Sequence, residues 1–478
     1  MLIFRALLLM AVGLLSSVSS TADVISLDVL PCGRPGEAGG LAGGTDLYRM
    51  VVDTARYPNA ICNDGSPAVF YIRRYSIPDN RNKWHIQLQG GGACGSGQSC
   101  AERWCSANTN FGMDKMTSSL SKPSIRATGI LSPNSESQFA TWNHVLIYYC
   151  SSDSWTGRAH GVDLEATQDS GSVNYMIYFQ GADVVDSVFD ILSNPTGRIR
   201  PVRREPGSVV PRMPDLDDAT DVLISGSSAG GGGVKNNGDR LAALLRTNNV
   251  HCAEGDCPLD VRLLLDSTFF PAYENIDYAS SVFCMSDPEK CDYEGFIKAQ
   301  NDDVNVGLWQ WSTDDSCLAY HGAVERGDAW RCADGTHIMQ HHVTTPMMVG
   351  QDLQDQLLAG NFTEFGFGDL FDFGSSVRSQ LLDLEQLDQL AEEGSAHTGI
   401  PLVRPATFGS QCQGHENLGN RKSFYDVKVE VYGVRYSYHD VVWNWWSGAL
   451  PSNVVQPFQQ RERSPVVLDS RAGQGSAA

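Results

Sequence analysis

A serine that could act as a nucleophile lies among small residues at positions 226–230. The segment Gly226-Ser-Ser-Ala-Gly230 follows the apolar run 221–225 and precedes a helix-forming stretch. A nucleophilic serine on a sharp strand-to-helix turn needs small neighbours, and the N-terminus of the helix favours the negative charge that develops in acyl transfer. A simple Gly-rich loop is the alternative in a chain this rich in Gly and Ser. The position between strand and helix makes Ser228 the candidate nucleophile.

A second glycine-rich turn could supply hydrogen-bond donors for an oxyanion. The strand-like run Trp84 to Leu88 leads into three successive glycines at 90–92. We expect the backbone N–H groups of Gly91, Gly92 and Ala229 to form the oxyanion hole. The alternative is a turn that only requires positive backbone angles. We favour the oxyanion role because both glycine-rich turns follow strand ends, where such folds place their sites.

An acid and a histidine are expected after Ser228, in that order. The apolar segment 346–350 is followed by Gln351 and Asp352, which places an acid at the C-terminal end of a predicted strand. Asp352 is the first choice for the acid and Asp355 the second. The alternative for either residue is a surface aspartate that starts a helix, a common use of that side chain.

Three histidines follow the predicted strand, namely His397, His415 and His439. His415 is preferred because it lies in a turn-like setting close to Cys412, which could hold that turn in place. His439 is next to Asp440, but sequence neighbours seldom face one another in the geometry that a catalytic pair requires. We therefore interpret His439 as an ordinary surface or core histidine.

The elements that must position these residues alternate between short apolar runs and stretches with helical spacing. This alternation predicts an α/β fold with a mainly parallel sheet and helices on both faces. The expected helices cover Ala182 to Leu192 and Val234 to Leu245. The expected strands cover Val69 to Arg73, Trp84 to Leu88, His144 to Tyr149, Val222 to Ser225, Val261 to Leu265 and Pro346 to Val349.

The 478 residues are expected to form one catalytic domain over residues 23–455. Residues 268–342 are Cys-rich and aromatic, and we interpret them as an insertion that could form a lid. Residues 1–22 have the layout of a secretory signal peptide, and residues 456–478 are expected to be a loose tail. No stretch approaches about 18 continuous apolar residues, so we expect no stable membrane insertion. The protein should be secreted, or periplasmic if its source is bacterial.

Thirteen cysteines in a secreted chain indicate a disulfide-supported fold with at least one unpaired thiol. A zinc site is the rival interpretation, but Cys94, Cys100 and Cys105 lack the two-residue gap of zinc knuckles, and no His-Glu-x-x-His motif occurs. We therefore expect no metal. The pairs expected from their proximity are Cys252 with Cys257, Cys284 with Cys291, and Cys317 with Cys332.

The net charge of −21 argues against nucleic-acid partners, because phosphate binding requires Lys and Arg. An acidic polysaccharide would also be repelled at long range unless a local basic group overrides the net charge. The 42% hydrophobic and 19% charged residues are typical of a globular protein with a large core.

Taken together, these segments resemble the pectin acetylesterase family, which also contains the Notum carboxylesterases. The resemblance runs from about Tyr57 to Ser447. The segments that carry it are Cys62-Asn-Asp-Gly-Ser-Pro-Ala68, Gly90-Gly91, Tyr149-Cys150-Ser-Ser-Asp153-x-Trp155-x-Gly157, Gly181-Ala182, Gly226-Ser-Ser-Ala-Gly-Gly231, Asp239-Arg240, Asp266-Ser267 and His415.

The resemblance implies an α/β-hydrolase fold, a Ser-Asp-His triad and no metal or organic cofactor. Ser228 and His415 match the motifs of the family, and Asp352 is the matching acid. Gly92 stands where Notum-like members often carry an aromatic residue.

The sequence therefore predicts a secreted serine carboxylesterase whose substrate is an ester. The expected reaction is removal of O-acetyl groups from an extracellular polysaccharide such as pectin. One alternative is a Notum-like deacylase that removes a fatty acyl group from a protein. Another is an inactive secreted carbohydrate-binding protein, in which Trp443, Trp445 and Trp446 would form a sugar-stacking surface.

Overall fold

The computed structural model describes residues 26–32, 43–106, 111–169, 171–193, 213–252, 256–270, 278, 284, 287–323, 325–362, 367, 369–385, 398 and 402–457. The expected signal peptide, the candidate His397, and the expected tail beyond residue 457 lie outside these residues. The proposed extents of the domain and of its insertion stay predictions.

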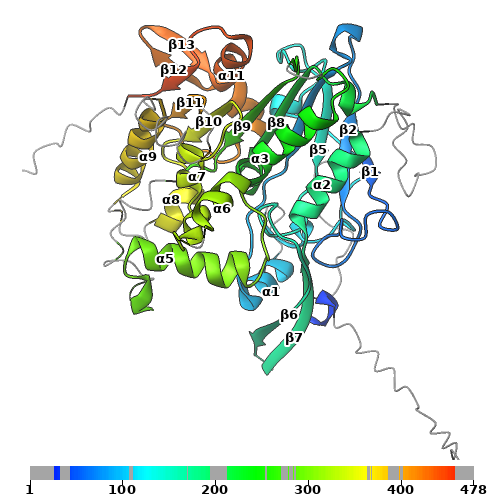
Figure 1. Cartoon of the computed structure of the whole chain (residues 1–478), viewed down its shortest axis with the longest axis vertical. Coiled ribbons are helices and arrows are strands. Elements are labelled where there is room, and N and C mark those ends of the chain that lie inside the picture. The colour runs from blue at the N-terminus through cyan, green and yellow to red at the C-terminus, as the bar shows by residue number, and fades with distance from the viewer. Residues whose placement is uncertain are drawn as a thin grey trace, which may run out of the picture.

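In the described part of the chain, one sheet has ten strands in the order β14-β11-β10-β9-β8-β3-β5-β2-β1-β4 (Figure 1). Neighbours from β14 to β5 are parallel, whereas β5, β2, β1 and β4 pair antiparallel. This confirms the predicted mainly parallel sheet. The strands are β1 (Gly43–Val51), β2 (Val69–Arg73), β3 (Lys83–Leu88), β4 (Ser124–Ile125), β5 (Asn143–Ile147), β8 (Asp221–Ser227), β9 (Asp260–Asp266), β10 (Met347–Asp352), β11 (Ala406–Ser410) and β14 (Asn453–Val455).

The register brings the carboxyl ends of the central parallel strands to one edge of the sheet. Leu88 at the end of β3 pairs with Gly226 of β8, and Ser227 pairs with Asp266 at the end of β9. On β10, Gly350 also pairs with Asp266. Residues that directly follow β3, β8, β9 and β10 therefore meet at a single edge, which is where open α/β sheets bind ligands.

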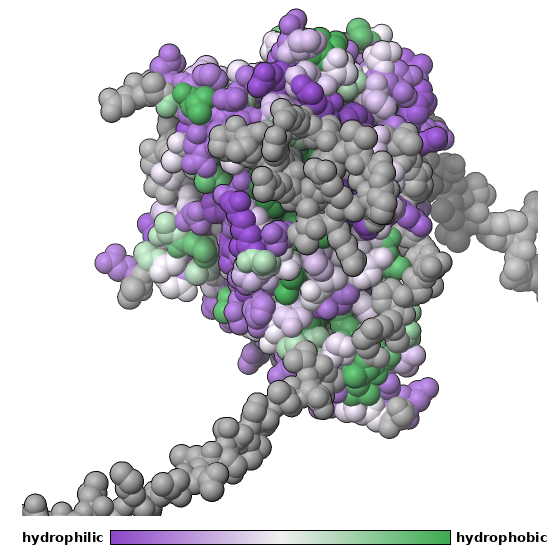
Figure 2. Space-filling view, turned by 90° about the vertical axis from the view of Figure 1, so that its right-hand side faces the viewer, coloured by the Kyte–Doolittle hydropathy of each residue, from purple (hydrophilic) through white to green (hydrophobic). Residues whose placement is uncertain are grey.

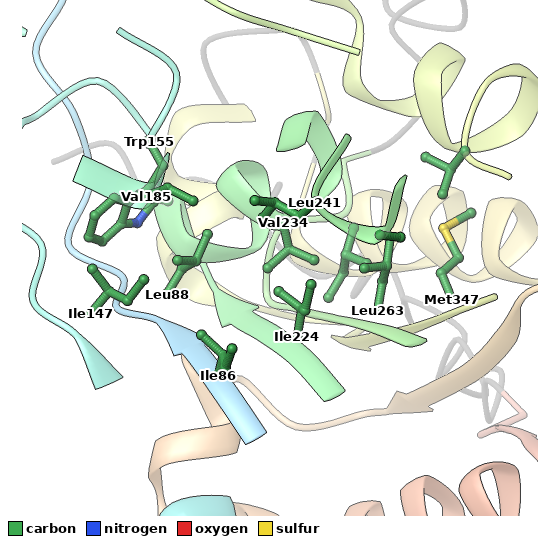
Figure 3. Close-up of a cluster of buried hydrophobic side chains, with 14 of the residues drawn as sticks. Ile86, Leu88, Ile147, Trp155, Val185, Ile224, Val234, Leu241, Leu263 and Met347 are labelled. Carbon is green, nitrogen blue, oxygen red and sulfur yellow. The ribbon is translucent and has the colours of Figure 1, made fainter. Parts of the chain in front are cut away.

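Alternate side chains of the central strands enter two separate cores, one on each face. Leu263 and Leu265 of β9 join the core beneath helices α2 (Gly181–Leu192) and α3 (Ala229–Asn248), part of which Figure 3 shows. Leu264 points to the opposite face, where helix α11 (Tyr438–Ser447) packs. Helices therefore cover both faces of the sheet, as predicted.

The remaining helices and hairpins surround this sheet. The hairpin of β6 (Ala159–Gln168) and β7 (Gly171–Phe179) projects from the body in Figure 1. A second hairpin pairs β12 (Lys428–Val431) with β13 (Val434–Ser437). The other α-helices within the described residues are α1 (Gly97–Cys105), α5 (Tyr293–Ala299), α6 (Asp315–His321), α7 (Gly335–His341), α8 (Gln356–Phe362) and α9 (Leu370–Glu385).

The described helices include none that is both long and apolar enough to cross a bilayer. On the face shown in Figure 2, hydrophilic side chains cover much of the visible coloured surface, and hydrophobic ones form small separate groups.

Six disulfides support the fold, and they include the three pairs predicted from the sequence. Cys412 is the free cysteine of the described residues, as the odd count required. It therefore does not hold the neighbouring turn through a disulfide. The six bonds are Cys32–Cys105, Cys62–Cys150, Cys94–Cys100, Cys252–Cys257, Cys284–Cys291 and Cys317–Cys332.

Candidate active site

Ser228 lies at the sharp turn between β8 and α3. Its backbone angles, φ 56° and ψ −125°, are sparsely populated by non-glycine residues. The turn is tight enough that a Cβ atom on Gly226 would lie 2.2 Å from the carbonyl oxygen of Gly230. A Cβ atom on Gly230 would lie 2.1 Å from the carbonyl oxygen of Leu88. The two glycines are therefore required by close backbone packing, and the turn carries the serine past the end of the sheet.

His415 contacts Asp355, the second choice for the acid. The Nδ1 atom of His415 lies 2.7 Å from Oδ2 of Asp355, whose side chain is fully buried. The other carboxylate oxygen of Asp355 accepts hydrogen bonds from the backbone N–H groups of Leu357 and Leu358 at the start of α8. Asp355 therefore caps a helix and holds the imidazole at the same time. The Nε2 atom of His415 is buried and has no hydrogen-bond partner among the described residues.

Asp352, the first choice from the sequence, hydrogen-bonds to the loop that carries His415. It accepts hydrogen bonds from the hydroxyl of Ser410 and from the backbone N–H of Gly414, the latter at 3.0 Å. The physical reason is that β10 continues through Asp352, which lies opposite Ser410 of the neighbouring strand β11, so the two side chains meet on one face of the sheet. The acid that reaches the imidazole comes three residues later, where the chain turns into α8. The imidazole therefore contacts the acid that was ranked second, and Asp352 holds the surrounding loop.

Charges around His415 favour its protonated form. Burial lowers the pKa of the imidazole, but the hydrogen bond and charge of Asp355 raise it, and the charges of Glu416 and Asp266 add to this effect. The net result is a pKa above the usual histidine value. The site therefore stabilises the imidazolium that forms when a histidine takes a proton from a nucleophile.

The turn after β9 joins the serine turn to the histidine loop. The carboxylate of Asp266 accepts hydrogen bonds from the hydroxyl of Ser227 at 2.7 Å and from the backbone N–H of Leu418 at 3.2 Å. The hydroxyl of Ser267 accepts a hydrogen bond from the backbone N–H of Glu416 at 2.9 Å. Sequence reasoning named Asp266 and Ser267 only as part of the family pattern and gave them no role. The structure shows that they connect the two loops.

Gly91 and Gly92 form a turn with positive φ angles of 144° and 68°. The guanidinium of Arg103, on α1, donates a hydrogen bond of 2.6 Å to the carbonyl oxygen of Gly91. Gly92 and Ala229 line the same cavity as Ser228. The turn therefore needs glycine for its conformation, and two of the three expected oxyanion donors belong to residues at the wall of the cavity that contains the serine.

This cavity has a volume of about 340 Å³ and is bounded by several segments distant in sequence. The predicted insertion 268–342 supplies a large part of the wall. Its aromatic members include Phe270, Trp309 and Trp311, and Phe111 contributes a further ring. Polar side chains are interspersed with these rings, so the cavity is apolar in part and polar in part.

A lysine lies in the cavity on the same helix that begins at the serine. Ser228, Gly232, Lys235 and Asn236 all line the cavity, and their spacing places them on one face of α3. Burial lowers the pKa of Lys235 to about 8, although the charge of Asp334 opposes this effect. The ammonium is therefore charged near neutral pH and faces the space that a substrate would occupy. Sequence reasoning did not identify Lys235.

His439 is a buried histidine whose Nδ1 atom lies 3.8 Å from Oδ1 of Asp440, its neighbour in the sequence. Its ring packs against Phe424 and Tyr425 with centroids 5.4 and 5.0 Å apart. The neighbouring Asp440 caps α11 and forms an ion pair with Lys428. These contacts agree with the interpretation of His439 as an ordinary histidine.

Comparison with known proteins agrees with this architecture. Residues 43–197 match the model of the pectinacetylesterase family. Palmitoleoyl-protein carboxylesterase notum2 of Xenopus laevis is 30% identical over 298 residues, which cover 62% of this chain and 49% of the relative. Palmitoleoyl-protein carboxylesterase NOTUM of Drosophila melanogaster is 30% identical over 375 residues, covering 77% of this chain and 45% of the relative. The chain thus spans about half the length of these curated relatives.

A solved structure of the Wnt deacylase Notum from Drosophila superposes with a TM-score of 0.59 and 24% identity. The match covers 87% of this chain and 97% of that one. These findings confirm the resemblance to the pectin acetylesterase family with its Notum members, whose α/β-hydrolase fold this chain shares.

Proposed function

We propose that the protein is a secreted serine carboxylesterase in which Ser228 is the nucleophile, His415 the general base and Asp355 the acid. The observation that carries this proposal is the 2.7 Å contact between His415 and Asp355. The loop of His415 is joined to the serine turn through Asp266, which accepts hydrogen bonds from Leu418 and from Ser227. An acid that orients a histidine next to a strained serine turn is the arrangement used for acyl transfer on several folds.

In the proposed reaction, His415 takes the proton of the Ser228 hydroxyl as the oxygen attacks the ester carbonyl. Asp355 holds the imidazole by Nδ1, so that Nε2 accepts this proton. The imidazolium then gives the proton to the departing alcohol, and an acyl-serine remains. Water attacks the acyl group, again with His415 as the base, and releases the carboxylic acid.

The negative charge on the carbonyl oxygen requires hydrogen-bond donors fixed before the reaction starts. We assign this role to the backbone N–H groups of Gly91, Gly92 and Ala229. The hydrogen bond from Arg103 to the carbonyl oxygen of Gly91 supports the assignment, because it fixes the peptide units of the glycine turn. The start of α3 adds a favourable helix dipole at Ala229.

The substrate that we favour is an O-acetyl group on an extracellular polysaccharide such as pectin. Lys235 supports this choice, because an ammonium in the cavity suits a substrate with a carboxylate near the ester. Such a local charge also offsets the long-range repulsion that a net charge of −21 exerts on an anionic polymer. The family model points in the same direction.

Removal of a fatty acyl group from a protein is the second candidate. Phe111, Phe270, Trp309 and Trp311 in the cavity wall favour it, since aromatic rings suit an apolar chain. The curated relatives are named as palmitoleoyl-protein carboxylesterases. An inactive carbohydrate-binding protein is less well supported, because Trp446 is buried against Trp142 with ring centroids 5.1 Å apart, and the side chain of Trp443 packs against Phe139.

Secretion is part of the proposal. Six disulfides are typical of proteins that fold in an oxidising compartment, and a reducing cytoplasm would not maintain them.

The first test combines labelling with a fluorophosphonate and hydrolysis of p-nitrophenyl acetate by the purified chain. Ser228→Ala should lose both the label and turnover. His415→Gln should lose turnover, whereas the matched variant His439→Gln should keep it, because His439 belongs to a separate core. A labelled serine other than Ser228 would contradict the proposal.

A second experiment separates the two substrate classes. Rates of hydrolysis are compared for esters from acetate to octanoate, and acetate release from acetylated pectin is then measured.

A further inference from the structure

Three histidines that the proposed esterase chemistry does not use meet within the predicted insertion. His321 ends α6, His337 lies within α7, and His342 follows α7. Their ring centroids are 4.9, 5.4 and 5.3 Å apart, so the three rings form a nearly equilateral triangle. The side chains of His321 and His342 are almost completely buried.

This triangle has the dimensions of a metal site. A tetrahedral zinc ion with Zn–N bonds of about 2.0–2.1 Å would hold the centroids of its imidazole ligands about 5 Å apart. The candidate ligand atoms of His321, His337 and His342 lie within 4.8 Å of one another, and the Nε2 atoms of His321 and His337 are 2.8 Å apart. Metal ligation would require this last distance to widen to about 3.3 Å, which is a small displacement for two side chains.

Neighbouring groups orient two of the rings. The Nδ1 atom of His321 lies 2.9 Å from a carboxylate oxygen of Asp328, and Nδ1 of His342 lies 3.1 Å from the hydroxyl of Ser316. Both contacts leave Nε2 as the atom directed to a metal. A carboxylate behind a ligating histidine is the usual outer partner in zinc sites, and it fixes the tautomer and raises the basicity of the ligand. The negative charge of Asp328 would also offset part of the charge of a bound cation.

A fourth side chain lies near the three rings but does not act as a ligand. Cys317 is close to the cluster, but its sulfur is bonded to Cys332 and supplies no thiolate. Water would complete the coordination.

We propose that His321, His337 and His342 form a binding site for a divalent transition metal, with zinc as the fitting ion. Imidazole ligands suit Zn²⁺ and also bind Cu²⁺ and Ni²⁺, whereas Ca²⁺ and Mg²⁺ prefer oxygen. The spacing of the three histidines matches no standard zinc motif, and so the sequence alone predicted no metal. α6 and α7 bring them together, and the Cys317–Cys332 disulfide joins α6 to the segment before α7.

The site would stiffen one wall of the substrate cavity. Gly335, the first residue of α7, lines the cavity, and a Cβ atom at this position would lie 2.3 Å from the ammonium of Lys235. A metal that links α6 to α7 would therefore fix the wall that faces Lys235. The metal takes no part in the acyl-transfer steps, so the site and the proposed esterase can succeed or fail separately.

The test measures metal binding directly on the purified full chain. The chain is stripped with a chelator, dialysed, and titrated with Co²⁺ and then with Zn²⁺. We expect about one tightly bound ion per chain, visible absorption bands typical of tetrahedral Co²⁺, and their loss when Zn²⁺ displaces the cobalt. Zn²⁺ should also raise the melting temperature of the stripped protein in a saturable manner.

Two variants and one matched control make the assignment specific. His321→Gln and His342→Gln should each weaken Co²⁺ binding at least about tenfold and abolish the tetrahedral spectrum. His160→Gln, which changes an exposed histidine outside the cluster, should bind as the wild type does. Circular dichroism and a cooperative thermal transition show that each variant has folded. A folded wild type that binds no Co²⁺ or Zn²⁺ would overturn the proposal and leave a metal-free cluster joined by a hydrogen bond between His321 and His337. An unchanged Co²⁺ spectrum in the folded His321 and His342 variants would also overturn it.

Discussion

Asp355 and His415 are joined by a 2.7 Å contact between Oδ2 and Nδ1, whereas Asp352, three residues earlier, hydrogen-bonds to the loop that carries the histidine. We therefore expect Asp355→Asn to lower kcat for p-nitrophenyl acetate by about a thousandfold or more, because the amide favours the wrong tautomer of the imidazole. Asp352→Asn keeps an oxygen that can accept from Gly414, and we expect a loss within about tenfold. The comparison uses steady-state kinetics on both variants. A larger loss in the Asp352 variant would return the acid to the residue first chosen from the sequence.

The pH dependence of the reaction should report the raised pKa of His415. A general base acts only when it is neutral, so activity should rise with pH through the pKa of the imidazole. Because the hydrogen bond and charge of Asp355, together with the charges of Glu416 and Asp266, outweigh burial, the midpoint for kcat/KM should lie above the usual histidine value of 6.5. In Asp355→Asn the raising effects of Asp355 disappear, and the midpoint of the residual activity should move to lower pH. The check is a pH profile with a neutral ester, and a wild-type midpoint below 6.5 would contradict it.

Arg103 should act as a positioning residue for the glycine turn. Its guanidinium donates to the carbonyl oxygen of Gly91 and lies within 3.3 Å of the position that a Cβ atom on Gly92 would occupy. We expect Arg103→Met to lower kcat roughly tenfold with little change in KM, which is less than the loss of about a hundredfold when an oxyanion donor itself is removed. Glu102→Gln, which alters the neighbouring exposed residue of α1, is the control and should leave kcat unchanged. An increase in KM alone would assign Arg103 to substrate binding instead.

The central sheet could be predicted from the sequence because its strands are buried on both faces. Such strands appear as continuous apolar runs, and β2 and β3 begin and end within one residue of the predicted positions. The outer strands of the sheet were not predicted, neither β14 and β11 at one end nor β1 and β4 at the other. β11 consists of Ala-Thr-Phe-Gly-Ser and β14 of three residues, which is too little apolar sequence to distinguish a strand from a loop.

The limits on predicting the site arise from contacts between distant segments. The strand-to-helix rule located Ser228 because the turn is formed by consecutive residues. The acid was harder to choose, since Asp352 and Asp355 are both near a strand end, and only the path of the chain into α8 determines which carboxylate reaches His415. Lys235 was not identified because its position in the cavity depends on the insertion that packs over α3.

Lys235 should determine whether the enzyme prefers an anionic polysaccharide. Its ammonium lies in the cavity and is charged below a pKa of about 8, so a uronate next to the ester would gain an ion pair in a partly desolvated site. We expect Lys235→Met to raise KM for acetylated pectin about tenfold and to leave KM for neutral acetylated xylan within about twofold. The methionine is similar in length and removes the charge, so hydrolysis of octanoyl esters should improve.

Lys235→Arg keeps the charge and should keep the preference for pectin. Acetate release from the two polymers at matched acetyl concentration gives the ratio of their KM values. An equal change in KM for both polymers would show that Lys235 shapes the cavity but does not bind the charge of the substrate.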